Sequence, residues 1–294
     1  MLRLMLDHHP QLTCPGEADF LTDALRPGDG PSGWEYDPDL LLDDRIFRDS
    51  LAALPEAEEA SVAFLEMTGH LRDGTDGCLV LDVHREIGRI LDLAPDVRIL
   101  HLVRDPRDVA RSAIGMGWAG NVYHGARIWQ RAEQAWEENL HRFSPGQVHE
   151  VRYEDLVRTP ETTLSEACAF LGVAYEPGML DYDGSSTYEP PDPGLAEQWR
   201  GKQTPRELGL VEPLFGDLLE ARGYALSGHP QITPNKLQRM ALMAGNKWGI
   251  WRTRVSRYGV ADPLVLAFAR RLYLDGLARR TKRRIDEKTL SYLK

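Results

Sequence analysis

The sequence predicts an α/β fold with a central parallel sheet flanked by helices. Residues 97–103 are rich in β-branched and other apolar residues, which is typical of a strand buried on both faces of a parallel sheet. A helix-start signal follows at once. Residues 147–157 repeat this order of strand and helix, and Thr159 and Pro160 then open a further helix.

The predicted strand stops at Arg104, and the next residues start a helix. Asp105 suits the N-cap, Pro106 the first helical position, and Asp108 lies beside the positive end of the helix dipole. Ser112 follows about two turns after the cap, on the same face as the two aspartates. Open α/β sheets bind ligands at the carboxyl ends of their strands, so an arginine and a hydroxyl here suit a phosphate. The alternative is an ordinary helix start with the arginine paired to a carboxylate.

Residues 104–112, Arg-Asp-Pro-Arg-Asp-Val-Ala-Arg-Ser, resemble the 3′-phosphate-binding motif of sulfotransferases, which use 3′-phosphoadenosine-5′-phosphosulfate (PAPS). The resemblance implies that Arg104 and Ser112 bind the 3′-phosphate of PAPS. It also implies a three-layer fold of the P-loop nucleoside-triphosphatase-like type, and transfer of a sulfuryl group to an acceptor hydroxyl without a metal. The acceptor class stays open among carbohydrate, lipid, peptide and small molecule. The alternative is a degenerate, non-catalytic protein that still binds the nucleotide.

Residues 1–17 resemble the bacterial relatives of protein-tyrosine sulfotransferases. In those relatives a strand and a loop that reads Pro-Arg-Ser-Gly-Thr-Thr precede the first helix and cradle the 5′-phosphosulfate. Neither is found ahead of the helical pattern at residues 1–9. We therefore expect that the sequence begins at an internal methionine of a longer protein, with a truncated, inactive homologue as the alternative.

Glu17 follows Gly16 and is expected to open a helix over residues 18–25. The resemblance implies that Glu17 is the general base for the acceptor hydroxyl. The alternative is a helix-start glutamate that the dipole favours. His8 and His9 are further candidates, although the His-Pro pair is also expected to end the first helix and pack there.

Two further segments match the family in part. Many relatives read Asp-Lys-Thr-Pro where this chain reads Asp-Val-His-Arg, so His84 or Arg85 could replace the lysine, with a plain helix start as the alternative. Residues 198–202 are similar to a late basic segment that closes over the donor nucleotide. The resemblance implies that Arg200 and Lys202 pair with its phosphates, while a solvated basic loop is the alternative.

Composition limits the class of protein. The 294 residues are 42% hydrophobic and 27% charged, as in an ordinary globular chain without a membrane span or signal peptide. The three cysteines are scattered, which predicts neither a metal cluster nor a disulfide framework and favours the cytoplasm. We expect a sulfotransferase-like domain over residues 1–230 and a helical extension over residues 231–294.

The extension carries a charge opposite to that of the rest of the chain. Residues 231–294 hold 5 Lys and 10 Arg against 4 acidic residues, a net charge of +11, so the first 230 residues carry −21 of the overall −10. Such an acidic body does not suit a nucleic-acid partner. The sequence of the extension predicts basic helices. They could pack on the domain, lie on an anionic membrane surface as a peripheral contact, or bind an anionic polysaccharide or glycolipid.

Overall fold

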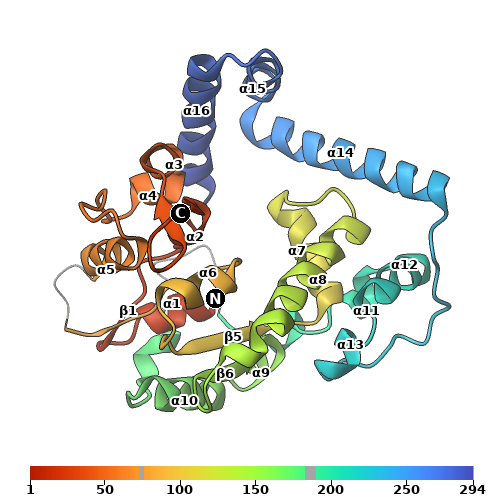
Figure 1. The fold of residues 1–294 in the computed structure, drawn as a ribbon. Coiled ribbons are helices and arrows are strands. Elements are labelled where there is room, and N and C mark those ends of the chain that lie inside the picture. Colours follow the sequence, from red (N-terminus) through yellow and green to blue (C-terminus); the bar gives the residue numbers. More distant parts are fainter. Residues whose placement is uncertain (73–75, 183–189, 294) are drawn as a thin grey trace. The chain divides into compact units, whose positions relative to one another are not determined.

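The computed structural model describes residues 1–72, 76–182 and 190–293, and these form a helix-rich α/β structure (Figure 1). Contacts divide the chain into two compact units. The first comprises Met1–His101, Ala135–Val151 and Thr159–Pro191, and the second comprises Leu102–Gln134, Arg152–Arg158 and Asp192–Lys294. The extension at residues 231–294 thus falls in the second unit, and its separation as a domain of its own stays a prediction.

The first unit is built from short helices and short strands. Its elements are α1 (Leu2–Asp7), β1 (Leu12–Thr13), α2 (Phe20–Asp23), β2 (Leu25–Pro27), β3 (Trp34–Tyr36), α3 (Pro38–Asp43), α4 (Arg45–Asp49), α5 (Ala60–Leu71), β4 (Cys78–Leu79), α6 (Ile87–Leu93), the 3₁₀ turn η1 (Leu140–Arg142), α10 (Pro160–Leu171) and the 3₁₀ turn η2 (Pro177–Leu180). A core of apolar side chains from α2, α3, α4, α5 and α6 holds this unit together, with Phe20, Leu41 and Met67 almost fully buried.

The described strands pair as three two-stranded sheets. β1 pairs with β4 in parallel, with Leu12 opposite Cys78, while β2 and β3 pair antiparallel. β5 (Ile99–Val103) pairs with β6 (Val148–Arg152). The parallel strands agree with the predicted α/β class, although the expected central sheet is divided into these pairs.

The prediction that residues 97–103 are buried on both faces is wrong. Within β5 only Val103 is buried, and the Leu102 side chain is 45% exposed. A strand buried on both faces needs neighbours at both edges and layers on both sides. In the part of the chain that the structure describes, β5 has β6 as its one strand neighbour, so its apolar sequence is only partly covered.

The second unit is almost wholly helical. Its elements are α7 (Pro106–Met116), α8 (Val122–Asn139, whose last residues belong to the first unit), α9 (Tyr153–Arg158), the 3₁₀ turn η4 (Pro193–Leu195), α11 (Trp199–Lys202), α12 (Pro205–Phe215), α13 (Leu218–Ala221), α14 (Lys236–Tyr258), α15 (Ala261–Arg271) and α16 (Asp275–Leu293). Val103, Ala110, Trp129, Val211 and Phe215 form its core, which joins the end of β5 to α7, α8 and α12. Over the residues described, no helix is both long and apolar enough to cross a membrane.

Candidate functional site

The junction between β5 and α7 has the predicted helix start. Asp105 is the N-cap of α7, and its Oδ1 accepts a hydrogen bond of 2.9 Å from the Arg107 backbone N–H. Pro106 occupies the first helical position and Asp108 the first turn, as the sequence predicts. Arg104 therefore lies at the point where the chain turns from strand to helix.

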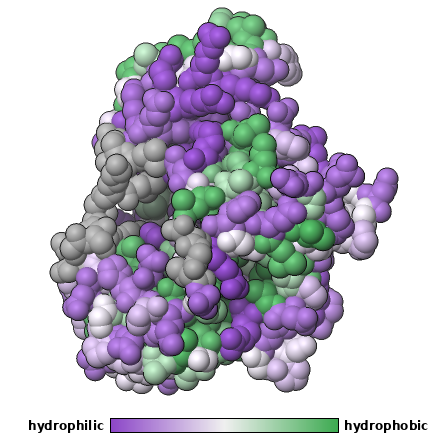
Figure 2. All heavy atoms as spheres, turned by 90° about the vertical axis from the view of Figure 1, so that its left-hand side faces the viewer, coloured by the Kyte–Doolittle hydropathy of each residue, from purple (hydrophilic) through white to green (hydrophobic). Residues whose placement is uncertain are grey.

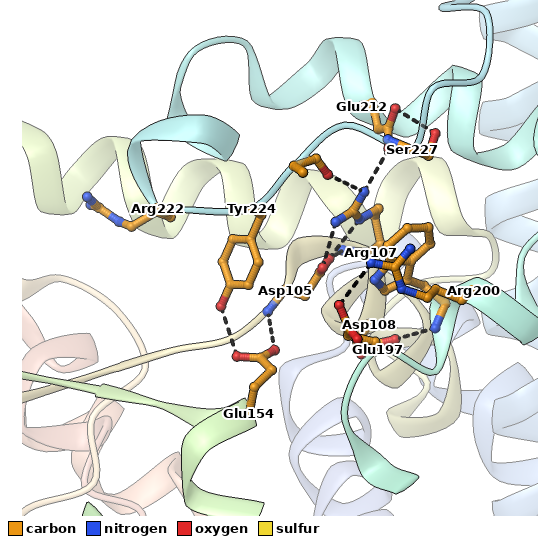
Figure 3. A network of polar contacts seen from close by, with 12 residues as sticks. Asp105, Arg107, Asp108, Glu154, Glu197, Arg200, Glu212, Arg222, Tyr224 and Ser227 are labelled. Atoms are coloured by element: carbon orange, nitrogen blue, oxygen red, sulfur yellow. Dashed lines mark hydrogen bonds and ion pairs between the residues drawn. The ribbon is translucent and has the colours of Figure 1, made fainter. Parts of the chain in front are cut away.

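A buried network of charges holds this turn in place (Figure 3). The Arg107 side chain is 2% exposed, and its guanidinium pairs with Asp105 at 2.7 Å and with Glu212 at 2.9 Å. Glu154 accepts hydrogen bonds from the Asp105 backbone N–H, at 2.9 Å, and from the Tyr224 hydroxyl, at 3.0 Å. The cap that orients α7 is thus bound on both sides by groups from α9, α12 and the segment after α13. Glu154 thus has a structural role at this turn.

Arg104 carries a buried donor that is unpaired within the part of the chain that the structure describes. Its guanidinium lies over the Tyr153 ring, 4.0 Å from the centroid, and its Nη2 donates to the Leu195 carbonyl oxygen at 3.3 Å. Its Nε is buried and, over the residues that the structure describes, has no hydrogen-bond partner. Within residues 1–72, 76–182 and 190–293, no carboxylate forms an ion pair with Arg104, so the simple pairing considered from the sequence is not found.

Asp108 fixes the basic segment against the start of α7. Its Oδ1 accepts from the Trp199 backbone N–H at 2.7 Å, and its Oδ2 from the Gln198 backbone N–H at 3.2 Å. Burial raises the pKa of Asp108, and the nearby Arg104 guanidinium opposes that shift. Trp199 is 3% exposed, and the guanidinium groups of Arg107 and Arg200 lie over its ring at 3.7 and 4.5 Å from the centroid. Arg104 directly precedes the N-cap of α7, and Asp108 holds the backbone next to Arg200 against the first turn of the same helix.

The two basic candidates of α11 are exposed and locally paired. Arg200 forms an ion pair of 3.0 Å with Glu197, and its hydrogen bond lowers the pKa of that glutamate. Lys202 Nζ donates to Gln198 Oε1 at 2.7 Å. These partners are only partly buried, so the solvated-loop alternative agrees with the contacts, and a role on a nucleotide phosphate stays a prediction.

Two arginines that the sequence did not single out lie in the same group of cations. Arg111 donates to the Lys202 carbonyl oxygen at 2.6 Å, and Arg158 pairs with Glu197 at 3.2 Å. Arg111 adjoins Ser112, so the motif itself could have drawn attention to it; Arg158, at the end of α9, has no such signal. Ser112 is exposed on α7, and no hydrogen bond joins it to Arg104 among the described residues, so their joint binding of a phosphate stays a prediction.

Glu17 lies in the first unit and outside a helix. The expected helix over residues 18–25 is shorter, since α2 begins at Phe20, and Glu17 instead forms an isolated parallel bridge with Asp82. Its side chain is 38% exposed, and Arg45 Nη2 lies 3.8 Å from its Oε2. Because Glu17 lies in an extended segment, the helix-start alternative does not account for it. Its partly exposed carboxylate can be reached by a ligand.

His84 is held next to the Glu17–Asp82 bridge by a buried aspartate. Asp19 accepts from the His84 backbone N–H at 2.9 Å and lies 3.0 Å from its Nδ1, while His84 Nε2 is 3.9 Å from Asp82. The hydrogen bond to Asp19 raises the pKa of His84 to about 9, with Asp82 and Glu17 adding to the shift. Arg85 pairs with Asp23 instead. His84 is therefore a cation beside Glu17 at neutral pH.

We expect the His84–Asp19 pair to stabilise the first unit only below alkaline pH. The pKa of His84 rises from 6.5 to about 9 on folding, so its stabilisation is complete below pH 6.5 and is lost as the pH rises to about 9. Because the imidazole is 41% exposed, we expect only about 1 kcal/mol. The measurement is the difference in unfolding free energy between the wild type and His84→Gln across this range. The exposed His141→Gln is the control, and an equal difference at both ends would contradict the assignment.

The two N-terminal histidines have structural roles. His9 is 2% exposed, its Nε2 lies 2.7 Å from the Ala174 carbonyl oxygen, and its Nδ1 accepts from the Gln11 backbone N–H at 3.0 Å. His8 bonds through Nδ1 to the Leu4 carbonyl oxygen at 2.8 Å. The first helix ends just before this pair, as expected, and His9 packs there, whereas Pro10 is exposed.

One family model matches more than half of this chain. The model of the sulfotransferase family matches residues 1–177. Carbohydrate sulfotransferase 5 of Mus musculus is 27% identical over 183 residues, which is 50% of this chain and 46% of that protein. An uncharacterized protein of Aquifex aeolicus (strain VF5) is 28% identical over 111 residues, 33% of this chain and 14% of that protein. The chain thus spans less than half the length of these two relatives.

Two solved structures share the fold. The sulfotransferase domain from the curacin biosynthetic pathway has a TM-score of 0.53 at 21% identity and covers 76% of this chain and 93% of its own. The sulfotransferase domain from the Synechococcus PCC 7002 olefin synthase has a TM-score of 0.53 at 20% identity, with coverages of 76% and 90%.

Proposed function

Because this chain belongs to the sulfotransferase family, we propose that it transfers a sulfuryl group from PAPS to an acceptor hydroxyl. PAPS supplies the sulfuryl group, and 3′-phosphoadenosine-5′-phosphate is the other product. The observation that supports this most directly is the buried Nε of Arg104, which has no hydrogen-bond partner among the described residues. A buried donor without a partner costs about 1–3 kcal/mol, and a phosphate oxygen would recover that cost.

The residues around Arg104 fit the phosphates of such a nucleotide. We assign the 3′-phosphate to Arg104 and the Ser112 hydroxyl, and the remaining phosphate charge to Arg200 and Lys202. The Tyr153 ring packs against one face of the Arg104 guanidinium, and the Leu195 carbonyl oxygen accepts from its Nη2. These contacts leave Nε to donate to a ligand. The exposed cations of α11 need only release Glu197 and Gln198 to reach a ligand.

Glu17 is the residue we assign as general base. Its carboxylate takes the proton of the acceptor hydroxyl as that oxygen bonds to sulfur and the bond between sulfur and the bridging phosphate oxygen breaks. Such a reaction depends on positioning and on charge stabilisation rather than on a covalent enzyme intermediate. We propose a carbohydrate hydroxyl as the first acceptor class to test, since one relative is a carbohydrate sulfotransferase.

We expect Arg104→Ala to weaken binding of 3′-phosphoadenosine-5′-phosphate by roughly 10- to 100-fold, because it removes charge-assisted hydrogen bonds to the 3′-phosphate. Isothermal titration calorimetry measures this. Arg131→Ala, which removes an exposed arginine of α8, is the matched control and should leave binding unchanged. Adenosine 5′-phosphate lacks the 3′-phosphate, so it should bind wild type and Arg104→Ala alike. Equal binding of the bisphosphate by both proteins would rule out this assignment.

A further inference from the structure

Helix α14 combines a strong positive charge with exposed apolar side chains. It is capped by a reciprocal pair of hydrogen bonds between Asn235 and Gln238 and runs to Tyr258. It contains no acidic residue. Its basic residues are Lys236, Arg239, Lys247, Arg252, Arg254 and Arg257. The structure buries no residue of this helix, so packing inside the second unit does not account for its apolar side chains.

One face of α14 is already occupied by the loop after α7. Asn246 Oδ1 accepts from the Gly120 backbone N–H at 2.7 Å, and the Leu242 carbonyl accepts from Asn121 Nδ2 at 2.8 Å. A Cβ on Gly249 would lie 2.5 Å from the Gly120 Cα, so the two backbones touch where both residues lack a side chain. This contact fixes the rotation of α14 within the second unit.

The opposite face is apolar and uncovered. At about 100° per residue, Leu237 and Trp248 lie about 20° apart around the helix, and Asn246 lies about 160–180° from both. Leu237 is 76% exposed and Trp248 68% exposed, with Met240 beside them at 54%. The basic side chains border this stripe. Counted around the helix from Leu237, three of them lie about 80–100° to one side: Lys236, Lys247 and Arg254. Arg252 lies about 60° to the other side. All four are exposed.

A second exposed apolar row follows in the same unit. Val260, the N-cap of α15, and Leu264 and Phe268 within the helix are spaced four residues apart and are 55%, 51% and 57% exposed, ahead of Arg270 and Arg271. The upper end of the view in Figure 2, the level of α15 and α16 in Figure 1, shows hydrophobic residues at the surface next to hydrophilic ones. Exposed apolar rows are thus a repeated feature of the extension, and the row of α15 ends at two arginines.

We propose that α14 lies on an anionic lipid surface, with Leu237, Met240 and Trp248 in the acyl boundary and the bordering lysines and arginines at the headgroups. An apolar stripe between basic rows, with tryptophan at its centre and no acidic residue, fits a negatively charged interface. Nucleic acid would use the charge but leave the apolar stripe in water. A second copy that paired its own α14 with this one would place six basic side chains against six others. The proposal stands apart from the proposed reaction.

The test is cosedimentation of the full chain with phosphatidylcholine vesicles, made with or without phosphatidylserine. We expect binding only when phosphatidylserine is present, and weaker binding at high salt. Leu237→Gln with Trp248→Gln should reduce binding at least about tenfold, since both apolar contacts are lost. Both side chains are exposed, so the variant should unfold at the wild-type temperature. Ser256→Gln, at an exposed position about 80° from Trp248, is the control and should bind as wild type.

Three results would overturn the proposal: no binding to anionic vesicles, equal binding by the glutamine variant, or a dimer that the variant abolishes while vesicles stay unbound. The last would assign the stripe to a second copy of the chain.

Discussion

Arg107→Met should lower the free energy of unfolding of the second unit by about 3–5 kcal/mol. The guanidinium neutralises Asp105 and Glu212, whose side chains are 2% and 1% exposed, so its removal leaves two buried carboxylates without a cation. It also donates to the Ala225 carbonyl oxygen at 3.0 Å, so a backbone acceptor loses its partner too. Urea unfolding followed by hydrogen exchange of α7 and α12 measures the loss.

The matched control for this change is an exposed ion pair of the same unit. Arg158→Met breaks a pair with Glu197 in which both side chains are more than a third exposed, and we expect it to cost less than about 1 kcal/mol. Adding Glu212→Gln to Arg107→Met should recover part of the stability, because one of the stranded charges is removed. A loss for Arg107→Met no larger than that for Arg158→Met would show that the buried network does not stabilise the unit.

Local features of this chain could be predicted from its sequence, and long-range ones could not. The cap at Asp105 and the proline at 106 act within one turn of helix, so their residue types suffice to place the start of α7. Arg107 lies in the same short segment, yet its partner Glu212 is 105 residues away and no spacing rule connects them. The sequence therefore identified the helix start but missed the network that makes it rigid.

The candidate site shows the same division. The motif predicted Arg104, and the structure adds that Tyr153 and the Leu195 carbonyl orient it. Asp108 was expected to interact with the helix dipole, whereas its carboxylate binds the backbone of residues 198 and 199. That contact joins the basic segment to α7, and only the folded chain reveals it. For β5, apolar composition indicated a strand correctly but could not indicate how many neighbours it has.

The largest effect on turnover is expected from Glu17→Gln, which should lower kcat for sulfuryl transfer about 10²- to 10⁴-fold, because the amide cannot accept the acceptor's proton. Formation of 3′-phosphoadenosine-5′-phosphate from PAPS, with a panel of carbohydrate hydroxyls, measures it. Affinity for the bisphosphate should not change, since Glu17 is assigned to the acceptor. Glu58→Gln, at an exposed carboxylate of the same unit, is the control and should keep full activity.

His84 lies near Glu17, beside the bridge between Glu17 and Asp82, but we assign it a different role. His84 is protonated at neutral pH, since the hydrogen bond to Asp19 raises its pKa to about 9, so it is already an acid when Glu17 is a base. We expect His84→Gln to reduce kcat less than Glu17→Gln does, because a protonated imidazole cannot take the acceptor's proton. Should His84→Gln instead abolish turnover while Glu17→Gln retains it, the base would have to be assigned elsewhere in the first unit.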